Sequence, residues 1–311
     1  MPVTRTVSIL LSVICLVGMS AVAQAQGGYG WICPSTAKVG TAPSVYAGYF
    51  FQHKGADFSF TITDPAANSV GELRQQFDLQ GILLELMVPV KGSGPLGLVL
   101  GWSYLFPIDR TAHETMTFTA DAARYRTWRA DTQWWDLQAA LTYDFVPSGT
   151  VILGFRYDSF QTNFHDPSVQ PGDTANLTIN GYIPFFGCAV SNIAPGTGLD
   201  IEVGAIGFPT MLGSVDYIEV VSAGIPIGGA EVLGFPASNG FGKGYFFEAF
   251  GEIGMPLLYG WQAAAFVKYS TINAHTQIHV GERNAEIPTT DYDFDLDRRI
   301  WVVGGRVSLC F

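Results

Sequence analysis

Hydrophobic and polar residues alternate over most of the chain beyond residue 43. The clearest segment is 133–145. One of its faces carries Trp135, Leu137, Ala139, Leu141, Tyr143 and Phe145, and the other carries Trp134, Asp136, Gln138, Ala140, Thr142 and Asp144. Because successive side chains of a strand point to opposite sides, a period of two predicts β-strands. The pattern predicts ten strands, at 44–52, 77–90, 96–107, 133–145, 150–161, 178–189, 199–209, 244–254, 261–272 and 298–311.

The connections between these segments alternate between short and long. The turns at 91–95, 147–149 and 255–260 are short, whereas the loops at 53–75 and 108–131 are long and polar. Tight turns at one end and long loops at the other are typical of antiparallel barrels of the bacterial outer membrane. The sequence therefore predicts an all-β fold, a transmembrane antiparallel up-and-down β-barrel that occupies 44–311 as one domain.

The segment 211–243 leaves the number of strands open. It is either one long outer hairpin or a further pair of spanning strands at 214–224 and 230–236, which would make twelve strands. The second of these segments is shorter than the roughly 9–11 residues that a tilted spanning strand needs. We therefore favour ten strands over twelve.

The two ends of the chain predict where it is delivered. Arg5, an apolar core at 7–18 and Ala23-Gln-Ala25 form a secretory signal peptide over 1–25, followed by a periplasmic leader at 26–43. The last strand is amphipathic and stops on Phe311, which resembles the closing strand of bacterial outer-membrane barrels. The resemblance implies that Phe311 is an insertion signal read by the barrel-assembly machinery. We expect a Gram-negative outer membrane as the location after cleavage.

Composition supports the same class of protein. The chain has 27 acidic and 16 basic residues, which excludes the basic surface needed for nucleic acid. Beyond the signal peptide no stretch approaches twenty apolar residues, so membrane-spanning helices are excluded. Lipid and lipopolysaccharide are the expected partners, met by aromatic girdles at both interfaces. The outer girdle is predicted at Phe106, Trp134, Trp135, Tyr245, Phe246 and Phe247, and the inner one at Tyr143, Phe145, Trp261 and Phe311.

Charged residues on the predicted inward faces form the first candidate site. They are Asp78, Asp136, Asp144, Arg156, Asp158, Asp200, Glu202, Glu248, Glu252, Lys268 and Arg306, and Gln80, Gln138 and Arg298 accompany them. Eight strands enclose a space that side chains fill, so ten should leave only a narrow lumen. Buried charges are costly unless paired, so we expect a salt-bridge network in a largely plugged lumen. The alternative is a narrow pore that prefers cations, favoured by the acidic excess.

An acidic run near the end of the chain is the second candidate site. Asp291, Asp293, Asp295 and Asp297 alternate with apolar residues, so a strand would project all four carboxylates outward, just above the lipid headgroups. Such oxygens suit Ca²⁺ or Mg²⁺, which also bridge lipopolysaccharide phosphates. EF-hand spacing is absent, and we favour a solvated acidic edge that discourages edge-to-edge pairing. No other cofactor is expected.

Histidines and cysteines are the remaining residues that could carry chemistry. Omptin-type surface proteases are ten-stranded and use Asp and His at the outer rim, but their paired motifs are missing here. An outer-rim hydrolase would need a Ser or Asp within hydrogen-bond reach of His165, His275 or His279, and we predict no enzyme.

Three cysteines follow the signal peptide, Cys33, Cys188 and Cys310. Cys33 would pair with either of the others, or all three stay unpaired.

These patterns favour a structural or surface-interaction protein, whose surface ligand the sequence does not identify. A narrow cation-preferring pore is the first alternative and a rim-located hydrolase is the second. Conductance of the refolded protein in a planar bilayer separates the first two.

Overall fold

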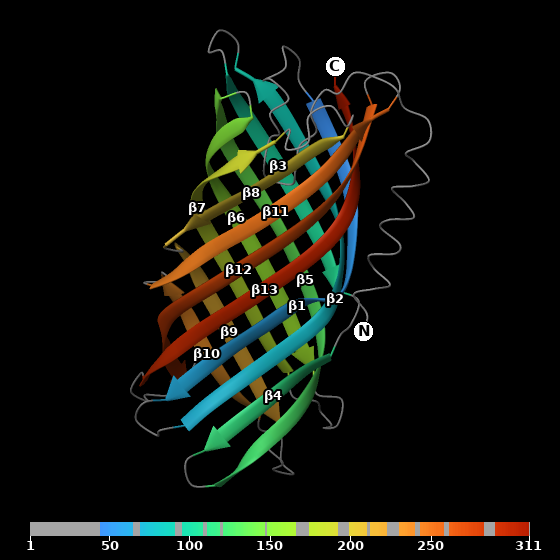
Figure 1. The fold of residues 1–311 in the computed structure, drawn as a ribbon. Coiled ribbons are helices and arrows are strands. Elements are labelled where there is room, and N and C mark those ends of the chain that lie inside the picture. Colours follow the sequence, from blue (N-terminus) through green and yellow to red (C-terminus); the bar gives the residue numbers. More distant parts are fainter. Residues whose placement is uncertain are drawn as a thin grey trace.

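The structure is a computed structural model in which every regular element is a β-strand (Figure 1). It describes residues 44–64, 69–90, 95–107, 111–118, 121–146, 148–165, 174–191, 199–209, 212–222, 230–239, 243–257, 261–282 and 290–310. The predicted signal peptide, the leader and Phe311 lie outside the described residues. Within these ranges, no helix is long and apolar enough to cross a membrane.

Thirteen strands make up the described fold. They are β1 (Ser44–Asp64), β2 (Ser69–Pro89), β3 (Leu96–Pro107), β4 (Thr111–Phe118), β5 (Asp121–Val146), β6 (Gly149–His165), β7 (Thr174–Val190), β8 (Asp200–Phe208), β9 (Leu212–Ser222), β10 (Ala230–Asn239), β11 (Lys243–Pro256), β12 (Trp261–Glu282) and β13 (Thr290–Cys310).

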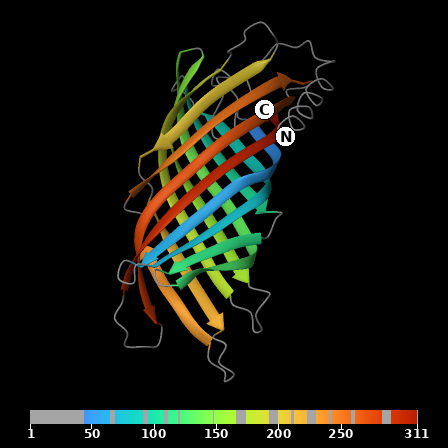
Figure 2. The same ribbon diagram turned by 60° about the horizontal axis from the view of Figure 1, so that its bottom comes forward.

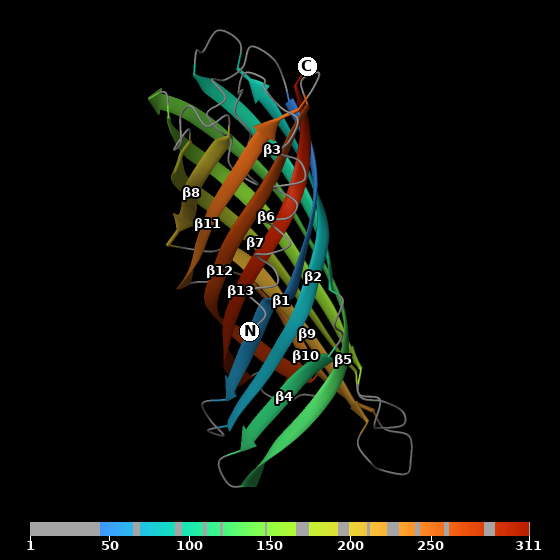
Figure 3. The ribbon, with the colours of Figure 1, turned by 45° about the vertical axis from the view of Figure 1, so that its right-hand side comes forward.

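The strands close into an antiparallel ring of ten (Figures 1 and 3). Its order is β1, β2, β3, β5, β6, β7, β8, β11, β12 and β13, and β13 pairs with β1 to close it. Ser44 lies opposite Cys310 in that closing pair, so the first and last strands begin and finish at the same end, called the terminal end here. The predicted antiparallel barrel of about ten strands is confirmed.

The remaining three strands lengthen the wall and do not widen it. Beyond Gly207 of β8, which pairs with Phe186, the wall continues at Leu212 of β9, which pairs with Tyr182 of the same neighbour, β7. In the same way β10 continues β11 along β12, and β4 continues β3 between β2 and β5. The ring therefore holds ten strands at both levels, and the alternative of twelve is wrong. Figure 2 shows β9 and β10 extending away from the terminal end.

The wall is longer than the sequence pattern predicts. The predicted loop at 53–75 consists largely of the far halves of β1 and β2, and 108–131 contains β4 and the start of β5. Among their described side chains, Asp57, Glu72 and Arg74 face outward, whereas Phe58 and Trp128 are buried inside. The strands therefore continue beyond the predicted lipid-spanning segment.

The two faces of a strand exchange character along its length. On β6, Leu153 and Phe155 are exposed outward near the terminal end, whereas Gln161 and Asn163 are exposed farther along. The buried face does the opposite, because Arg156 lies near the terminal end and Phe164 lies beyond it. We call the apolar outer surface the lipid-facing band and the rest of the wall the polar zone. A band that spans 135–145 on β5 has the length of a tilted transmembrane strand, about 9–11 residues.

Aromatic side chains mark the border between the two zones. Tyr269 and Trp301 lie 4.8 Å apart, and Tyr157 lies 5.1 Å from Trp135 and 5.2 Å from Tyr182, as ring centroids. Tyrosine and tryptophan rings are enriched at membrane–water interfaces, and a border between an apolar and a polar surface is where they are expected.

Two predicted girdle residues belong elsewhere. Trp134 and Phe246 are 2 % and 1 % exposed and lie on inward faces, so their assignment to the outer girdle is wrong. The outward neighbour of each carries the girdle role, because Tyr245 and Phe247 are exposed and Trp135 lies at the aromatic border. At the terminal end Tyr143, Phe145 and Trp261 are exposed, as predicted.

Phenylalanine–glycine pairs fill the interior of the lipid-facing band. Phe266 pairs directly with Gly304 and its ring covers that glycine, so that an added Cβ would meet Phe266 Cζ at 2.4 Å. Phe50, the other partner of Gly304, covers Gly81 with its ring. Phe185 covers Gly154 in the same way. Because a glycine leaves room above the backbone, each ring lies flat against the neighbouring strand and fills the lumen.

Candidate functional site: the barrel interior

Six buried ionisable residues form what we call the central layer. They are Asp136, Arg156, Asp158, Glu248, Lys268 and Arg298, each at most 4 % exposed. Arg156 donates to both oxygens of Glu248 at 3.2 and 3.3 Å, and Lys268 Nζ lies 2.9 Å from Glu248 Oε2. Three acids and three bases balance in this layer, as buried charges require.

The Arg298–Asp158 pair crosses the full width of the lumen. β13 and β6 stand on opposite sides of the ten-stranded ring, and the guanidinium of Arg298 makes two parallel bonds of 2.7 and 2.8 Å to Asp158. Trp134 Nε1 donates to the same carboxylate at 3.0 Å, and its ring lies 4.1 Å below the Arg298 guanidinium. Bidentate and cation–π contacts together fix both charges.

A second group, the acidic layer, lies nearer the terminal end. It contains the buried residues Glu85, Asp200, Glu202, Glu252 and Arg306. Arg306 donates to Glu252 and lies over the Tyr46 ring at 4.7 Å. With four carboxylates and one guanidinium, the acidic layer has a formal charge of −3. The acidic excess of the lumen is therefore confined to one level.

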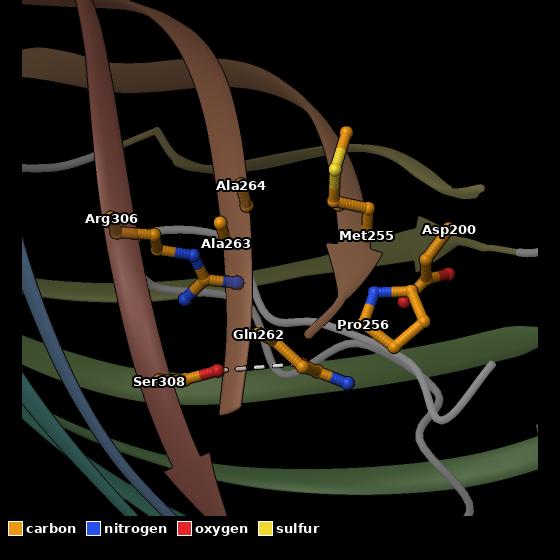
Figure 4. Close-up of a pocket in the computed structure, with 9 residues that line it drawn as sticks. Asp200, Met255, Pro256, Gln262, Ala263, Ala264, Arg306 and Ser308 are labelled. Carbon is orange, nitrogen blue, oxygen red and sulfur yellow. Dashed lines mark hydrogen bonds between the residues drawn. The ribbon is translucent and has the colours of Figure 1, made fainter. Parts of the chain in front are cut away.

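A small cavity adjoins the acidic layer on the side of the terminal end (Figure 4). Asp200, Gln262, Arg306 and Ser308 are among its lining residues, and Ser308 donates to the Gln262 side chain at 3.3 Å. Its volume of about 10 Å³ has room for roughly one water molecule.

Aromatic side chains occupy the interior inside the polar zone. Phe58 of β1 and Phe160 of β6 stack at 4.6 Å across the lumen, and Trp134 meets Phe160 edge-on at 6.1 Å. Farther from the terminal end, Trp128 meets Phe164 at 6.2 Å. The part of the barrel enclosed by the polar zone is therefore built like a water-soluble protein, with a mainly apolar core and a polar surface.

Most predicted lumen residues lie inside the barrel, and Asp144, Asp78 and Gln80 are the exceptions. Asp144 lies at the terminal-end edge, where it accepts a 2.6 Å bond from Thr150. Asp78 is on the outward face of β2, because Gly81, Leu83 and Glu85, which have the opposite parity, are buried. The prediction for Asp78 is therefore wrong, and so is that for Gln80, which accepts a bond from the outward Tyr49.

Glu85 is the functional residue that the sequence analysis missed. It is the only charge among the mainly apolar residues at 79–90, so either face of this segment could face lipid by hydrophobicity alone. A charged side chain that faces lipid is costly, so Glu85 has to face the lumen. This cost is the signal in the sequence that identifies the inward face of the segment.

The acidic run at the end of the chain forms part of a charged outer surface. Asp293, Asp295 and Asp297 lie on the outward face of β13 in the polar zone, whereas the side chain of Asp291 lies outside the described residues. Asp295 Oδ1 is 2.7 Å from His275 Nδ1, and Asp297 accepts from Arg299 at 2.6 Å.

Beside this surface lies a polar groove of about 180 Å³, lined by Asp57, Ser59, Glu72, Arg74, Asp297 and Arg299. Hydrogen bonds from Arg74 to Asp57, followed by the attraction of the two charges, raise the pKa of Arg74 above its ordinary value. Among the described residues, no three His, Cys, Asp or Glu side chains form a preassembled metal centre.

The remaining candidates divide between described and undescribed residues. His275 has an Asp within hydrogen-bond reach, the contact that the hydrolase alternative requires, and His165 is exposed at the far end of β6. The side chain of His279 lies outside the described residues. Cys188 is an outward-facing cysteine of β7, and its predicted pairing with Cys33 stays a prediction. Cys33 and the side chain of Cys310 lie outside the described residues.

Comparison with solved structures identifies the fold. No family model and no curated protein matches the sequence. The outer-membrane protease OmpT from Escherichia coli superposes with a TM-score of 0.60 at 7 % identity, over 86 % of this chain and 97 % of that one. The translocator domain of the autotransporter NalP from Neisseria meningitidis matches with a TM-score of 0.40 at 15 % identity, over 88 % of this chain and 89 % of that one.

At these identities the similarity concerns the fold alone. The superposition on OmpT agrees with the closed ring described above. The chain has the ten-stranded antiparallel barrel fold of bacterial outer-membrane proteins.

Proposed function

We propose that the protein is a structural outer-membrane barrel that does not conduct solutes and that displays a rigid polar cylinder outside the lipid. One observation carries the proposal: side chains from opposite walls meet inside the lumen. Arg298 reaches Asp158 across the central layer, and Phe58 reaches Phe160 just beyond it. A solute on the barrel axis would have to separate both contacts.

The energetics of these contacts also argue against a gate. Breaking a buried ion pair leaves an uncompensated charge, which costs about 3–5 kcal/mol. Separating the Phe58–Phe160 stack would in addition expose aromatic surface to water. A closed lumen therefore fits this interior better than the narrow cation pore that the acidic excess would favour.

Planar-bilayer recording of the refolded protein tests the closed lumen. We expect no conductance steps from the wild-type protein at any voltage, with a general porin inserted in the same bilayers as the positive control. Cation-selective steps from the wild type would overturn the proposal and support the pore. Steps that vanish in Arg306→Met, but persist in the outer-wall variant Arg299→Met, would locate the pore at the acidic layer.

The surface role rests on the outer wall just beyond the aromatic border. Arg299 is two residues from Trp301 on the same face of β13, and Asp297 is two residues farther, which places both at the level of lipid headgroups. Guanidinium groups bind phosphate directly, and carboxylates bind it through Ca²⁺ or Mg²⁺. We infer that lipopolysaccharide of the outer leaflet contacts this face, with the terminal end directed to the periplasm.

Retention of lipopolysaccharide through purification tests this contact. Asp295→Asn combined with Asp297→Asn should lower the retained amount, and a chelator should lower it in the wild type to the same level. Asp131→Asn, an exposed change on β5, is the matched control. Equal retention by both variants would remove this face from the proposal.

Hydrolysis is a second candidate function, favoured by the 2.7 Å contact between His275 Nδ1 and Asp295 Oδ1. An aspartate that orients a histidine is a component of general-base catalysis. The contact is on the exposed outer wall, where nothing excludes water. We therefore expect that His275→Ala folds like the wild type and that background cleavage of peptides or lipids is the same in both. A cleavage activity that is lost in His275→Ala would instead establish an enzyme.

A further inference from the structure

The acidic layer contains more negative charge than its own residues neutralise. Glu202 is acted on by the charges of Glu252, Asp200 and Glu85, while Arg306 is the cation that opposes them. Arg306 is already paired with Glu252. Glu85 comes from β2, on the side of the ring opposite β8, so the carboxylates converge from both walls. Carboxylates taken out of water need a counter-charge close by.

Glu202 is the residue in this layer without an internal partner. It is 1 % exposed, and neither of its carboxylate oxygens has a hydrogen-bond partner. It lies directly opposite Glu252 in the β8–β11 pair, and Glu252 Oε2 also has none. Directly opposed residues of neighbouring strands have Cα atoms only about 4.5–5.5 Å apart. Three carboxylate oxygens without a hydrogen-bond partner are therefore buried on two directly opposed residues.

An amide on the other side of the lumen provides an independent indication of a ligand. Gln138 of β5 is 5 % exposed, and neither its oxygen nor its nitrogen has a hydrogen-bond partner. Its side chain lies over Gly101, where it occupies the space that a Cβ would take, and Gly101 pairs directly with Glu85. The amide is therefore directed toward the acidic layer, and it carries another hard oxygen ligand.

We propose that the acidic layer binds one calcium ion, held between Glu202 and Glu252 and completed by oxygens of the surrounding layer. Carboxylate and amide oxygens are ligands for hard cations. Ca²⁺ accepts six to eight oxygens in irregular geometry, whereas Mg²⁺ demands a near-ideal octahedron and keeps several waters. The adjoining cavity has room for about one water, so the interior suits Ca²⁺ better.

The site assembles around its ion and is not a rigid cage. No three acidic side chains among the described residues form a ready centre, so Asp200 or Glu85 has to rotate toward the cation. Asp200 and Arg306 both line the cavity on the side of the terminal end, so an ion that enters from that end would not cross the Arg298–Asp158 pair (Figure 4). Binding therefore does not require conduction.

The experiment uses the refolded full barrel in detergent. Equilibrium dialysis with radioactive calcium measures binding, and the melting temperature is recorded in chelator, calcium and magnesium. We expect about one calcium per barrel, a melting temperature that rises with calcium concentration, and a smaller rise with magnesium. Absence of bound calcium at millimolar concentration would overturn the proposal. So would stabilisation by lowered pH alone, because protons would then be the only neutralising species.

Two variants separate binding from a merely structural role. Glu202→Gln keeps the shape and removes one charge, so it should weaken calcium binding at least tenfold and melt higher than the wild type in chelator, where repulsion with Glu252 is lost. Asp131→Asn, an exposed change on β5, should bind calcium like the wild type. Unchanged calcium binding by Glu202→Gln would refute the site.

Discussion

Arg298 and Asp158 join opposite walls of the barrel through two hydrogen bonds of 2.7 and 2.8 Å, so one ion pair bridges the lumen at its centre. The strands that carry them are not hydrogen-bonded to each other, and 140 residues separate the pair in sequence. The contact therefore forms only once the ring has closed.

Removal of this tie should destabilise the barrel. Arg298→Ala leaves the Asp158 carboxylate buried beside the Trp134 N–H donor without its guanidinium partner, and we expect the free energy of unfolding to fall by about 3–5 kcal/mol. Urea titration of the refolded protein in detergent measures it. The adjacent Arg299→Ala removes an exposed guanidinium of the same chemistry and should have no measurable effect. Similar losses in both variants would contradict the role of the cross-lumen pair.

A second prediction concerns Gly304, which lies under the Phe266 ring and beside the Phe50 Cβ atom. Gly304→Ala adds a methyl group where Phe266 Cζ lies at 2.4 Å, so both Phe50 and Phe266 must shift, at a cost of about 1–3 kcal/mol. The neighbouring Gly305 points outward, and the nearest atom to its added Cβ is the Ala264 carbonyl oxygen at 3.7 Å. Gly305→Ala should fold with unchanged stability in the same titration. Equal tolerance of both changes would mean that the rings do not fill the lumen.

The sequence was sufficient to predict the barrel and its ten strands because alternation is strong wherever one face meets lipid. On β5, Trp135 to Phe145 alternate with residues of the lumen without a break. The lengths of the strands were not predicted because the apolar residues move from the outward face to the inward face at the aromatic border. The described outward residues within 53–75, among them Asp57, Glu72 and Arg74, are polar, and a polar segment beyond a membrane strand was interpreted as a loop.

The candidate site was predictable in composition but not in partners. Arg156, Asp158, Glu248 and Arg306 were placed inside by parity alone. No sequence spacing indicates that Arg298 meets Asp158, since cross-lumen contacts depend on the stagger of the closed ring. Parity failed on β2, where consecutive apolar residues at 82–84 fit either face, and Asp78 was chosen over Glu85 as the inward acid.

A third prediction tests the division of the outer wall into two zones. Leu153 is 61 % exposed in the lipid-facing band, and Leu153→Arg would put a charge into hydrocarbon at a cost of about 2–4 kcal/mol. Gln161 lies on the same face of β6 within the polar zone, where Gln161→Arg should be tolerated. Unfolding titrations of both variants in lipid vesicles give the comparison. An equal effect of the two changes would contradict a border at the Trp135–Tyr157 contact.

The final prediction uses two adjacent tryptophans as reporters of the two sides of the wall. Trp134 is 2 % exposed inside the lumen, where it donates to Asp158, while Trp135 faces outward beside Tyr157 at the aromatic border. We consider variants in which every other tryptophan is replaced by phenylalanine and one of these two is retained. In vesicles of lipids brominated near the headgroup, Trp135 fluorescence should be strongly quenched, because its ring contacts the acyl chains.

Trp134 fluorescence should be unchanged in the same vesicles, because the wall of the barrel separates it from lipid. The retained Trp134 should also respond to Arg298→Ala, since the guanidinium 4.1 Å above its ring is lost, whereas Trp135 should not. Quenching of Trp134 by the brominated lipids would reverse the faces of β5 and with them the assignment of the whole central layer. Because the two residues are adjacent, a difference between them reports only the direction of the side chain and not its depth along the barrel.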